Sequence, residues 1–579
     1  MILKALYDYY ESKKNEMPSY NMALVNFMYA IQIDRDGNFK GIECLGDDEG
    51  ISLLTFRPEE RTSAPIAHCM GDNGSYVLGL KDVSREIPVD FEKELKKNIK
   101  NHEAFKEDVQ KIYVSLPNNQ YAQAVYAFYQ KYDINVIHQM CKDVNWLSLC
   151  KSLNKNITFR ILGEKSLAAS DSEIIDYKIS IAVNRNDDAI CLVTGNRTKP
   201  VTTTYSTFVV GGKSNAKLVA FQINSGYDSY GRKMGLNAPI STDAEFKYTT
   251  ALLSMLSKNS RNKFIVGNRT FVFWASKNNE AGKQVEEGIW KLFGFNDTNE
   301  DDPNKGITQV RRVFESIYTG SLKTSPDDKF YILGLAPNSA RIAVTYWAEI
   351  PLVEFAGRIN RHFKDMEIID GRKEQKPYSG LRSVLSAVTL DGKFSEVIPN
   401  LPEAVVKCIF QGLLYPQPLY ASCIRRIRAE QNLTITRAAV IKAYLNRLNN
   451  SEQKIKVMLD KENTNQGYLC GRLFAVLDKI QGDANGQHSI KERYMNAASS
   501  TPAAVFATIL NLSSHHSEKL KEGRDIFFER IKQEIMDKIE ADGFPAHLDL
   551  QDQGRFFVGY YHQMQSFYVK NEVQSEIDN

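Results

Sequence analysis

The spacing of apolar residues changes near residue 395, and this change constrains the fold more than any other feature. Before it, short apolar runs bounded by turn residues alternate with helical segments. Beyond it, apolar residues recur every three or four positions, as they do in helices. Since 579 residues are too many for one compact core, the sequence predicts an α+β protein. We expect a mixed α/β N-terminal body followed by an all-helical C-terminal bundle.

Three domains are expected, over residues 1–155, 156–394 and 395–579. The first opens with an amphipathic helix (MILKALYDYYESKK), continues with strands such as LVNFMYAIQID and YVLGL, and ends in helices from residue 90 onward. The turn residues Asp72-Asn73-Gly74 separate two of its apolar runs and predict a hairpin turn.

The second domain carries clearer local patterns. A capping box from Thr242 to Glu245 predicts a helix start, because serine or threonine at such a position satisfies free backbone amides. The run TFVFWA (270–275) predicts a buried strand. The polar and acidic segment 296–306 predicts a surface loop or linker.

Composition narrows the functional classes only in part. Lysine and arginine number 73 against 70 aspartates and glutamates, a formal net charge of +3, so any nucleic-acid site must rest on local clusters. None of the eight cysteines forms a Cys-x-x-Cys pair, which leaves zinc-ribbon and thioredoxin-like sites without support. A signal peptide and an apolar run of about 18 residues are both missing. We therefore expect a cytoplasmic protein with no membrane span and no cofactor.

The segment GGKS (211–214) resembles a phosphate-binding loop only superficially. The P-loop requires a glycine where Thr207 stands, so an ATP site is not predicted. Two interpretations remain: a plain surface hairpin, or a glycine turn that brings Lys213 against a nucleic-acid backbone. The pair His515-His516 has no metal-ligand motif beside it, so a metal site is not predicted there either.

Basic residues gather in two regions of the chain. In YPQPLYASCIRRIRAE (415–430), the row Leu419, Cys423 and Ile427 faces the core of a predicted helix, which leaves the arginines outside. These arginines and the basic residues of the next helix are either a solvated face or contacts to a nucleic-acid backbone: Arg425, Arg426, Arg428, Arg437, Lys442 and Arg447. The second region interleaves acids with Arg358, Arg361, Lys364, Arg372, Lys373, Lys376 and Arg382, which is typical of a mixed surface with some nucleic-acid contact. Four groups of aromatic side chains could stack on bases, although aromatics at these spacings usually belong to the core. They are Tyr227, Tyr230, Tyr248 and the FVFW run.

Several long strings, in one order along the whole chain, resemble the large subunit of the type I-C CRISPR Cascade surveillance complex. They are MILKALYDYYE (1–11), GDNGSYVLG (71–79), CLVTG (191–195), LVAFQINSGYDSYGRKMGLNAPISTDAEFKYTTALL (218–253), FVFWA (271–275), YILGLAPNSARIAV (331–344), YP…IRRIRAE (415–430), YLCGRLFAVLDKIQ (468–481) and RYMNAASSTPAAVF (493–506). One departure follows the CLVTG string, where the family pattern includes a histidine and this chain reads NRTKPVTTTYSTFVVGG. No role tied to that histidine is carried over.

The resemblance implies a non-catalytic DNA-binding subunit. Guide RNA held by other subunits reads the target by base pairing, while the large subunit recognises a short duplex flank, the PAM, and stabilises the R-loop. Implied partners are the guide RNA, the double-stranded target and its displaced single strand, the Cascade backbone and handle-binding subunits, a helical small subunit and a recruited helicase-nuclease. The first domain (1–155) would recognise the flank.

Resemblance and local charge together give the candidate nucleic-acid-binding residues: Asn73, Gly74, Ser75, Lys213, Arg232, Lys233, Arg341, Arg425, Arg426, Arg428, Arg437, Arg472 and Arg493. Two other functions remain open. A nuclease or helicase of the same defence system would cleave or unwind DNA by itself, and a purely architectural scaffold would be indifferent to the flank.

The C-terminal helices raise a further hypothesis. Residues 458–579 have the apolar spacing of a bundle that folds alone. In the family that the chain resembles, the helical small subunit is made from the same reading frame by internal initiation, and Met458 is the internal methionine that fits best. The alternative is that Met458 is simply an apolar residue on a helix.

Overall fold

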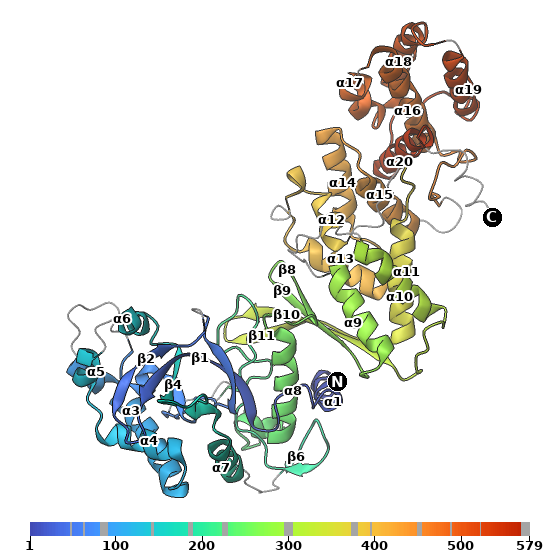
Figure 1. Ribbon diagram of the computed structural model, residues 1–579. Coiled ribbons are helices and arrows are strands. Elements are labelled where there is room, and N and C mark those ends of the chain that lie inside the picture. Colours follow the sequence, from blue (N-terminus) through green and yellow to red (C-terminus); the bar gives the residue numbers. More distant parts are fainter. Residues whose placement is uncertain are drawn as a thin grey trace. The chain divides into compact units, whose positions relative to one another are not determined.

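The computed structural model (Figure 1) contains two compact units, the first formed by residues 1–258 and 337–343 and the second by residues 259–336 and 344–579. The residues described are 1–46, 49–61, 64–81, 91–140, 144–182, 189–222, 228, 230–293, 305–371, 380–393, 397–448, 454–486, 489–521 and 523–568. The predicted α+β class is confirmed, because a mixed sheet, a second sheet and many helices share the chain. Residues 156–394, predicted as one body, contribute to both units.

A long central strand organises the sheet of the first unit. The second half of β1 (Met22–Ile33) pairs antiparallel with β2 (Phe39–Cys44) and parallel with β5 (Asn156–Ile161). Its first half pairs antiparallel with β3 (Ile51–Phe56), and β4 (Gly71–Asn73) adds to β5. Since parallel neighbours need a long crossover, the chain between β1 and β5 has room for several helices.

Helices α3 (Phe91–Ser115) and α4 (Gln120–Gln130) supply much of this unit's core. Their apolar residues, such as Phe105 and Val125, join Phe159 of β5 in one cluster. The remaining elements of the unit are α1 (Ile2–Ser12), α2 (Gly74–Val77), α5 (Ile134–Met140), α6 (Val144–Lys151), η2 (Ala168–Ser170), α7 (Ser172–Ala182), β6 (Ala189–Ile190), β7 (Arg197–Thr198), η3 (Met234–Asn237) and α8 (Thr242–Leu256).

The second unit is built on a four-stranded sheet of order β11-β10-β9-β8. Its strands are β8 (Lys263–Val266), β9 (Arg269–Ala275), β10 (Lys329–Asn338) and β11 (Arg341–Pro351). The predicted buried strand is confirmed as β9, whose Phe271, Phe273 and Trp274 are fully buried. Three helices pack with this sheet in the same core: α9 (Glu280–Phe293), α10 (Lys305–Tyr318) and α11 (Leu352–Met366). Most of the predicted 296–306 loop lies outside the described residues, and α10 begins within its last two residues.

Beyond residue 397, the described part of the chain contains helices and no strand, as predicted. The helices of this part and just before it are α12 (Leu381–Ser386), η4 (Leu390–Gly392), α13 (Leu401–Gln411), α14 (Gln417–Glu430), α15 (Ile435–Leu448), α16 (Gln466–Asn485), α17 (Ser489–Ala498), α18 (Pro502–Ser517), α19 (Arg524–Met536) and α20 (Leu550–Ser566). Figure 1 shows α16 and α20 together within the group of C-terminal helices. Of the helix pairs that the described residues form, this one has the most extensive contact.

One local prediction is wrong, and another is confirmed for the start of its helix but not for its cap. The run YVLGL is not a strand, because α2 begins at Gly74 and takes in its first residues. Helix α8 begins at Thr242 as predicted, but its cap is Ser241 and not Thr242. The Ser241 hydroxyl accepts a hydrogen bond from the Ala244 amide. Glu245, released from the predicted capping box, binds Arg57 in an ion pair of 2.9 Å.

Candidate nucleic-acid interface

The segment before α8 forms a surface with very little regular structure. Between residues 189 and 241 the described residues contain only β6, β7 and η3. Backbone hydrogen bonds hold it in place: the amides of Leu192 and Val201 donate to the carbonyls of Pro239 and Ile240, each at 2.9 Å. The segment is therefore fixed by its contacts although it lacks strands and long helices.

The turn between β10 and β11 completes this surface. Residues 337–343 belong to the first unit, and Arg341 forms a parallel bridge with Lys217. The Ile342 amide donates to the Lys217 carbonyl at 3.1 Å. We call residues 199–222, 228, 230–241 and 337–343 the loop surface.

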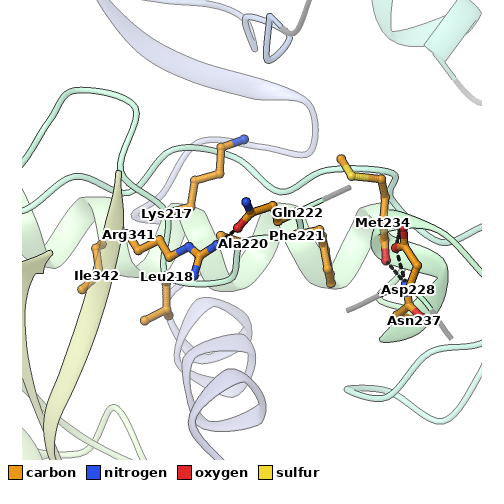
Figure 2. Close-up of a pocket in the computed structure, with 10 residues that line it drawn as sticks. All are labelled: Lys217, Leu218, Ala220, Phe221, Gln222, Asp228, Met234, Asn237, Arg341 and Ile342. Carbon is orange, nitrogen blue, oxygen red and sulfur yellow. Dashed lines mark hydrogen bonds between the residues drawn. The ribbon is translucent and has the colours of Figure 1, made fainter. Parts of the chain in front are cut away.

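A cavity of about 310 Å³ opens in the loop surface (Figure 2). At one end, the Arg341 guanidinium donates to the Gln222 side chain. At the other end, the Asp228 carboxylate accepts from the Met234 amide at 3.3 Å and from the Asn237 side chain at 3.2 Å. Figure 2 shows these two polar groups at opposite ends of the pocket. The cavity therefore offers both donors and acceptors, as recognition of polar ligand edges requires.

The loop surface also carries three exposed cations outside the cavity lining. Lys213, Arg232 and Lys233 are exposed, and in the described part of the chain none of them has a carboxylate at ion-pair distance. Lys217 differs, because Glu60 lies 3.1 Å from its ammonium group. Next to Arg232, the Tyr230 side chain is 100% exposed. A fully exposed aromatic ring beside unpaired cations suits contact with phosphates and bases.

The GGKS segment lies in a surface turn of the loop surface. The Thr207 amide donates to the Ala216 carbonyl at 2.8 Å and closes the turn, which leaves Lys213 exposed. The next long helix starts only at Thr242, whereas a P-loop leads directly into a helix whose amides hold phosphate. This geometry agrees with the interpretation as a surface turn and not with a nucleotide site.

The predicted flank-contacting turn is not a hairpin. Asn73 ends β4 and caps α2, and its side-chain oxygen accepts from the amide and the hydroxyl of Ser75, at 3.0 and 2.7 Å. Gly74 and Ser75 are both buried. Gly74 is packed so closely that a Cβ there would lie 2.5 Å from the Leu153 side chain. Of the three residues, Asn73 alone keeps partial exposure and can present its amide nitrogen.

The arginines of α14 differ in exposure. The row Leu419, Cys423 and Ile427 is buried, as predicted. Arg425 is exposed, whereas Arg426 and Arg428 are half-buried. Glu430 lies 3.7 Å from the guanidinium of Arg426, so Arg425 is the residue of this group best placed to meet a ligand.

Two predicted contact residues are buried instead. Arg437 donates to the carbonyls of Ala387 and Asn432, both at 2.7 Å. Arg472 has an exposed fraction of 0% and donates to Gln563 at 3.0 Å and to Glu534 at 2.8 Å. Placing these two side chains on the surface was wrong, because protein acceptors surround both guanidinium groups. Lys442 and Arg447 on the same helix as Arg437 are buried as well.

The remaining candidates are divided by burial. Arg493 is exposed on α17. Tyr248 and the FVFW run are buried core residues, while Tyr227, Arg372, Lys373 and Lys376 lie outside the described residues. Sequence inspection missed Lys217, Gln222 and Asp228, since the bridge from Lys217 to Arg341 joins distant parts of the chain and has no local pattern.

Among the described residues, no group of three or more histidine, cysteine, aspartate or glutamate side chains could hold a metal ion. None of the helices they form is long and apolar enough to cross a bilayer.

Comparison with known protein families matches nearly the whole chain. A family model described as CRISPR-associated protein (Cas_Csd1) matches residues 6–568. No curated protein matches the chain.

Proposed function

Because the chain belongs to the Cas_Csd1 family of CRISPR-associated proteins, we propose that it is the non-catalytic DNA-binding large subunit of a type I-C Cascade complex. In this role it recognises the PAM flank of the target duplex, stabilises the R-loop and recruits the helicase-nuclease. R-loop formation is nearly balanced in energy, so protein contacts to the flank and the backbones decide whether it proceeds.

The observation that carries this proposal is the loop surface. It presents Lys213, Arg232 and Lys233 without acidic partners among the described residues, and the exposed Tyr230 stands two residues before Arg232. Unpaired cations gain affinity for phosphates by releasing condensed counterions, and an exposed ring adds stacking. Asn73 is the second contact that we propose, because its amide can donate to a base edge of the flank.

The proposed partners follow from this role. They are the guide RNA, the target duplex and its displaced strand, the backbone and handle-binding subunits, the helicase-nuclease and a helical small subunit. We further propose that the small subunit is the product of internal initiation at Met458, so that one gene supplies both chains.

Target-duplex binding by the assembled complex, with and without this chain, tests the proposal. We expect tight binding only with the chain, and weaker binding when the flank of the duplex is changed. Equal binding to every flank would favour an architectural scaffold. Metal-dependent cleavage of DNA by the purified chain would favour a nuclease instead.

A further inference from the structure

Helix α11 has one face that the core does not use. Its buried face includes Phe355, Ile359 and Phe363. On the other face Val353, Gly357, Arg361 and Lys364 follow one another at helical spacing, and Val353, Arg361 and Lys364 are exposed. A helix face with an apolar start and a basic end is thus open within the second unit.

This face lines an open groove of about 810 Å³, which we call the α11 groove. Its other walls include Tyr318 at the end of α10, and Gln411 and Gly412 at the end of α13. Gly357 leaves room for the Tyr318 ring: a Cβ there would lie 2.9 Å from the ring. The ring nevertheless stays 56% exposed, so it forms an accessible aromatic wall.

The charge of the α11 groove is positive. Its one acidic lining residue, Glu354, pairs with Arg358, which also donates to the Phe410 carbonyl at 2.8 Å. The charges of Arg361 and Lys364 are not neutralised, since no carboxylate among the described residues is at ion-pair distance from either. Two unneutralised cations one helical turn apart attract an acidic ligand.

Aliphatic side chains next to the groove favour a protein ligand. Val353 is exposed within it, and Leu413 and Leu414, which follow Gly412, are 54% and 56% exposed. Nucleic-acid interfaces are strongly polar, whereas protein partners anchor apolar side chains in pockets and keep charged pairs at the rim.

We propose that the α11 groove docks an acidic segment of a partner protein that also carries aliphatic side chains. The aliphatic side chains pack on Tyr318 and Val353, and the acidic ones pair with Arg361 and Lys364. This inference concerns a protein partner and does not depend on the DNA contacts of the loop surface.

Fluorescence polarisation of the full-length chain with a labelled peptide of alternating aspartate and leucine tests the proposal. A peptide of alternating lysine and leucine and a single-stranded oligonucleotide serve as competing probes. The variants are Arg361→Glu with Lys364→Glu, which reverses the charge, and Val353→Ser, which removes the aliphatic wall. Lys519→Glu with Lys521→Glu is the matched control, since both lysines are exposed on the same unit and outside the groove.

We expect the aspartate–leucine peptide to bind, the charge reversal to weaken it at least tenfold, and Val353→Ser to weaken it several-fold. The control should bind as the unaltered chain does. Equal affinity in the charge-reversed variant and its control would overturn the proposal, as would no binding of the peptide at all. It would also fail if the oligonucleotide bound more tightly than the peptide and lost that binding on charge reversal, because the groove would then be a nucleic-acid site.

Discussion

Three buried histidines make this chain sensitive to acid. Burial lowers the pKa of His102 to about 4, and that of His362 and His562 to about 3. Nearby cations act in the same direction, Arg447 on His362 and Lys442 on His562. Below about pH 6.5, these histidines bind protons in the unfolded chain but not in the folded chain. The free energy of unfolding therefore falls as the pH falls towards 3 or 4.

We expect each buried histidine to cost about 1.4 kcal/mol of unfolding free energy per pH unit below its ordinary pKa. His562→Gln should remove that share of the slope and keep a polar partner for the Tyr468 hydroxyl, which lies 3.0 Å from Nδ1. Urea unfolding between pH 7 and pH 5 measures it. His515→Gln is the control, because that side chain is exposed. The same slope in both variants would contradict the prediction.

Asn73 combines a structural and a proposed binding role, and a suitable substitution separates them. Alanine would remove the α2 cap and cost about 1 kcal/mol of stability. Serine keeps an oxygen for the cap but lacks the amide nitrogen proposed to contact the flank. We expect Asn73→Ser to keep the melting temperature, weaken binding to the preferred flank by about 1–3 kcal/mol and relax discrimination at one flank position.

Binding of the assembled complex to a panel of flank variants measures this prediction. If Asn73→Ser distinguishes the flanks as well as the unaltered chain does, Asn73 does not contact a base. Asn73→Ala serves as the stability control in the same panel, since it removes the cap as well.

The cations of the loop surface should act through phosphates. Each phosphate contact contributes about 0.9 to the slope of log affinity against log salt concentration. Arg232→Ala with Lys233→Ala should therefore lower this slope by about 2 and leave the flank preference unchanged. Lys14→Ala with Lys111→Ala removes two other exposed lysines of the same unit and should leave the slope unchanged. An unchanged slope in the first variant would assign Arg232 and Lys233 to a solvated face.

Arginine exposure could not be deduced from the sequence. Arg472 and Arg232 are the same residue type, yet Gln563 and Glu534 surround the first while the second is exposed. The acceptors of Arg472 come from helices far along the chain. Only tertiary packing brings them together, so local charge patterns overestimate a basic surface.

Apolar spacing predicted most helices and strands, and backbone contacts determined the remaining elements. The buried row of α14 and the core strand β9 follow directly from the sequence pattern. The start of α2 does not, because the cap at Asn73 and the close approach of Leu153 to Gly74 override a strand-like run. The loop surface could not be predicted from the sequence either, because long-range hydrogen bonds hold it together and no periodic pattern of side chains marks it.

Glycines explain why α16 and α20 pack so extensively. A Cβ at Gly471 would lie 1.9 Å from the Phe556 carbonyl oxygen, and one at Gly559 would lie 2.2 Å from that of Tyr468. Each helix therefore presents a glycine where the backbone of its neighbour passes. Neither glycine has a positive φ, so close approach and not conformational freedom requires them.

Gly471→Ala should destabilise the second unit by about 1–3 kcal/mol or more, because the helices must separate to admit the methyl group. In an open helix the same change stabilises by roughly 1 kcal/mol, so the clash alone accounts for a loss. Chemical denaturation measures the effect. Ala503→Gly, at an exposed position of α18, gives the propensity contribution by itself. A stabilised Gly471→Ala would show that the helix pair is looser than the structure has it.

The arrangement of the C-terminal helices bears on the proposed second product of the gene. Met458 does not lie on a helix, contrary to one interpretation of the sequence, but in the irregular segment before α16. A product that begins there keeps α16 to α20 intact, with the Asn465 cap of α16. It loses the packing of α15 on α20 and several hydrogen bonds, such as those from the Tyr420 hydroxyl to the Leu550 carbonyl (2.6 Å) and from the Tyr561 hydroxyl to the Ile369 carbonyl (2.8 Å).

Expression of the native gene with a C-terminal tag should therefore yield two tagged chains, the shorter one starting at Met458. The shorter chain should unfold cooperatively by itself, because the α16 and α20 pair supplies its core. Met458→Leu should abolish it and leave the full-length chain unchanged, with intact mass and N-terminal sequencing as the measurements. Met495→Leu is the matched control: Met495 lies inside α17, so a start there would discard α16 and leave α20 without its main partner. A single full-length chain, in a host able to initiate at Met458, would contradict internal initiation and leave the DNA-binding proposal standing.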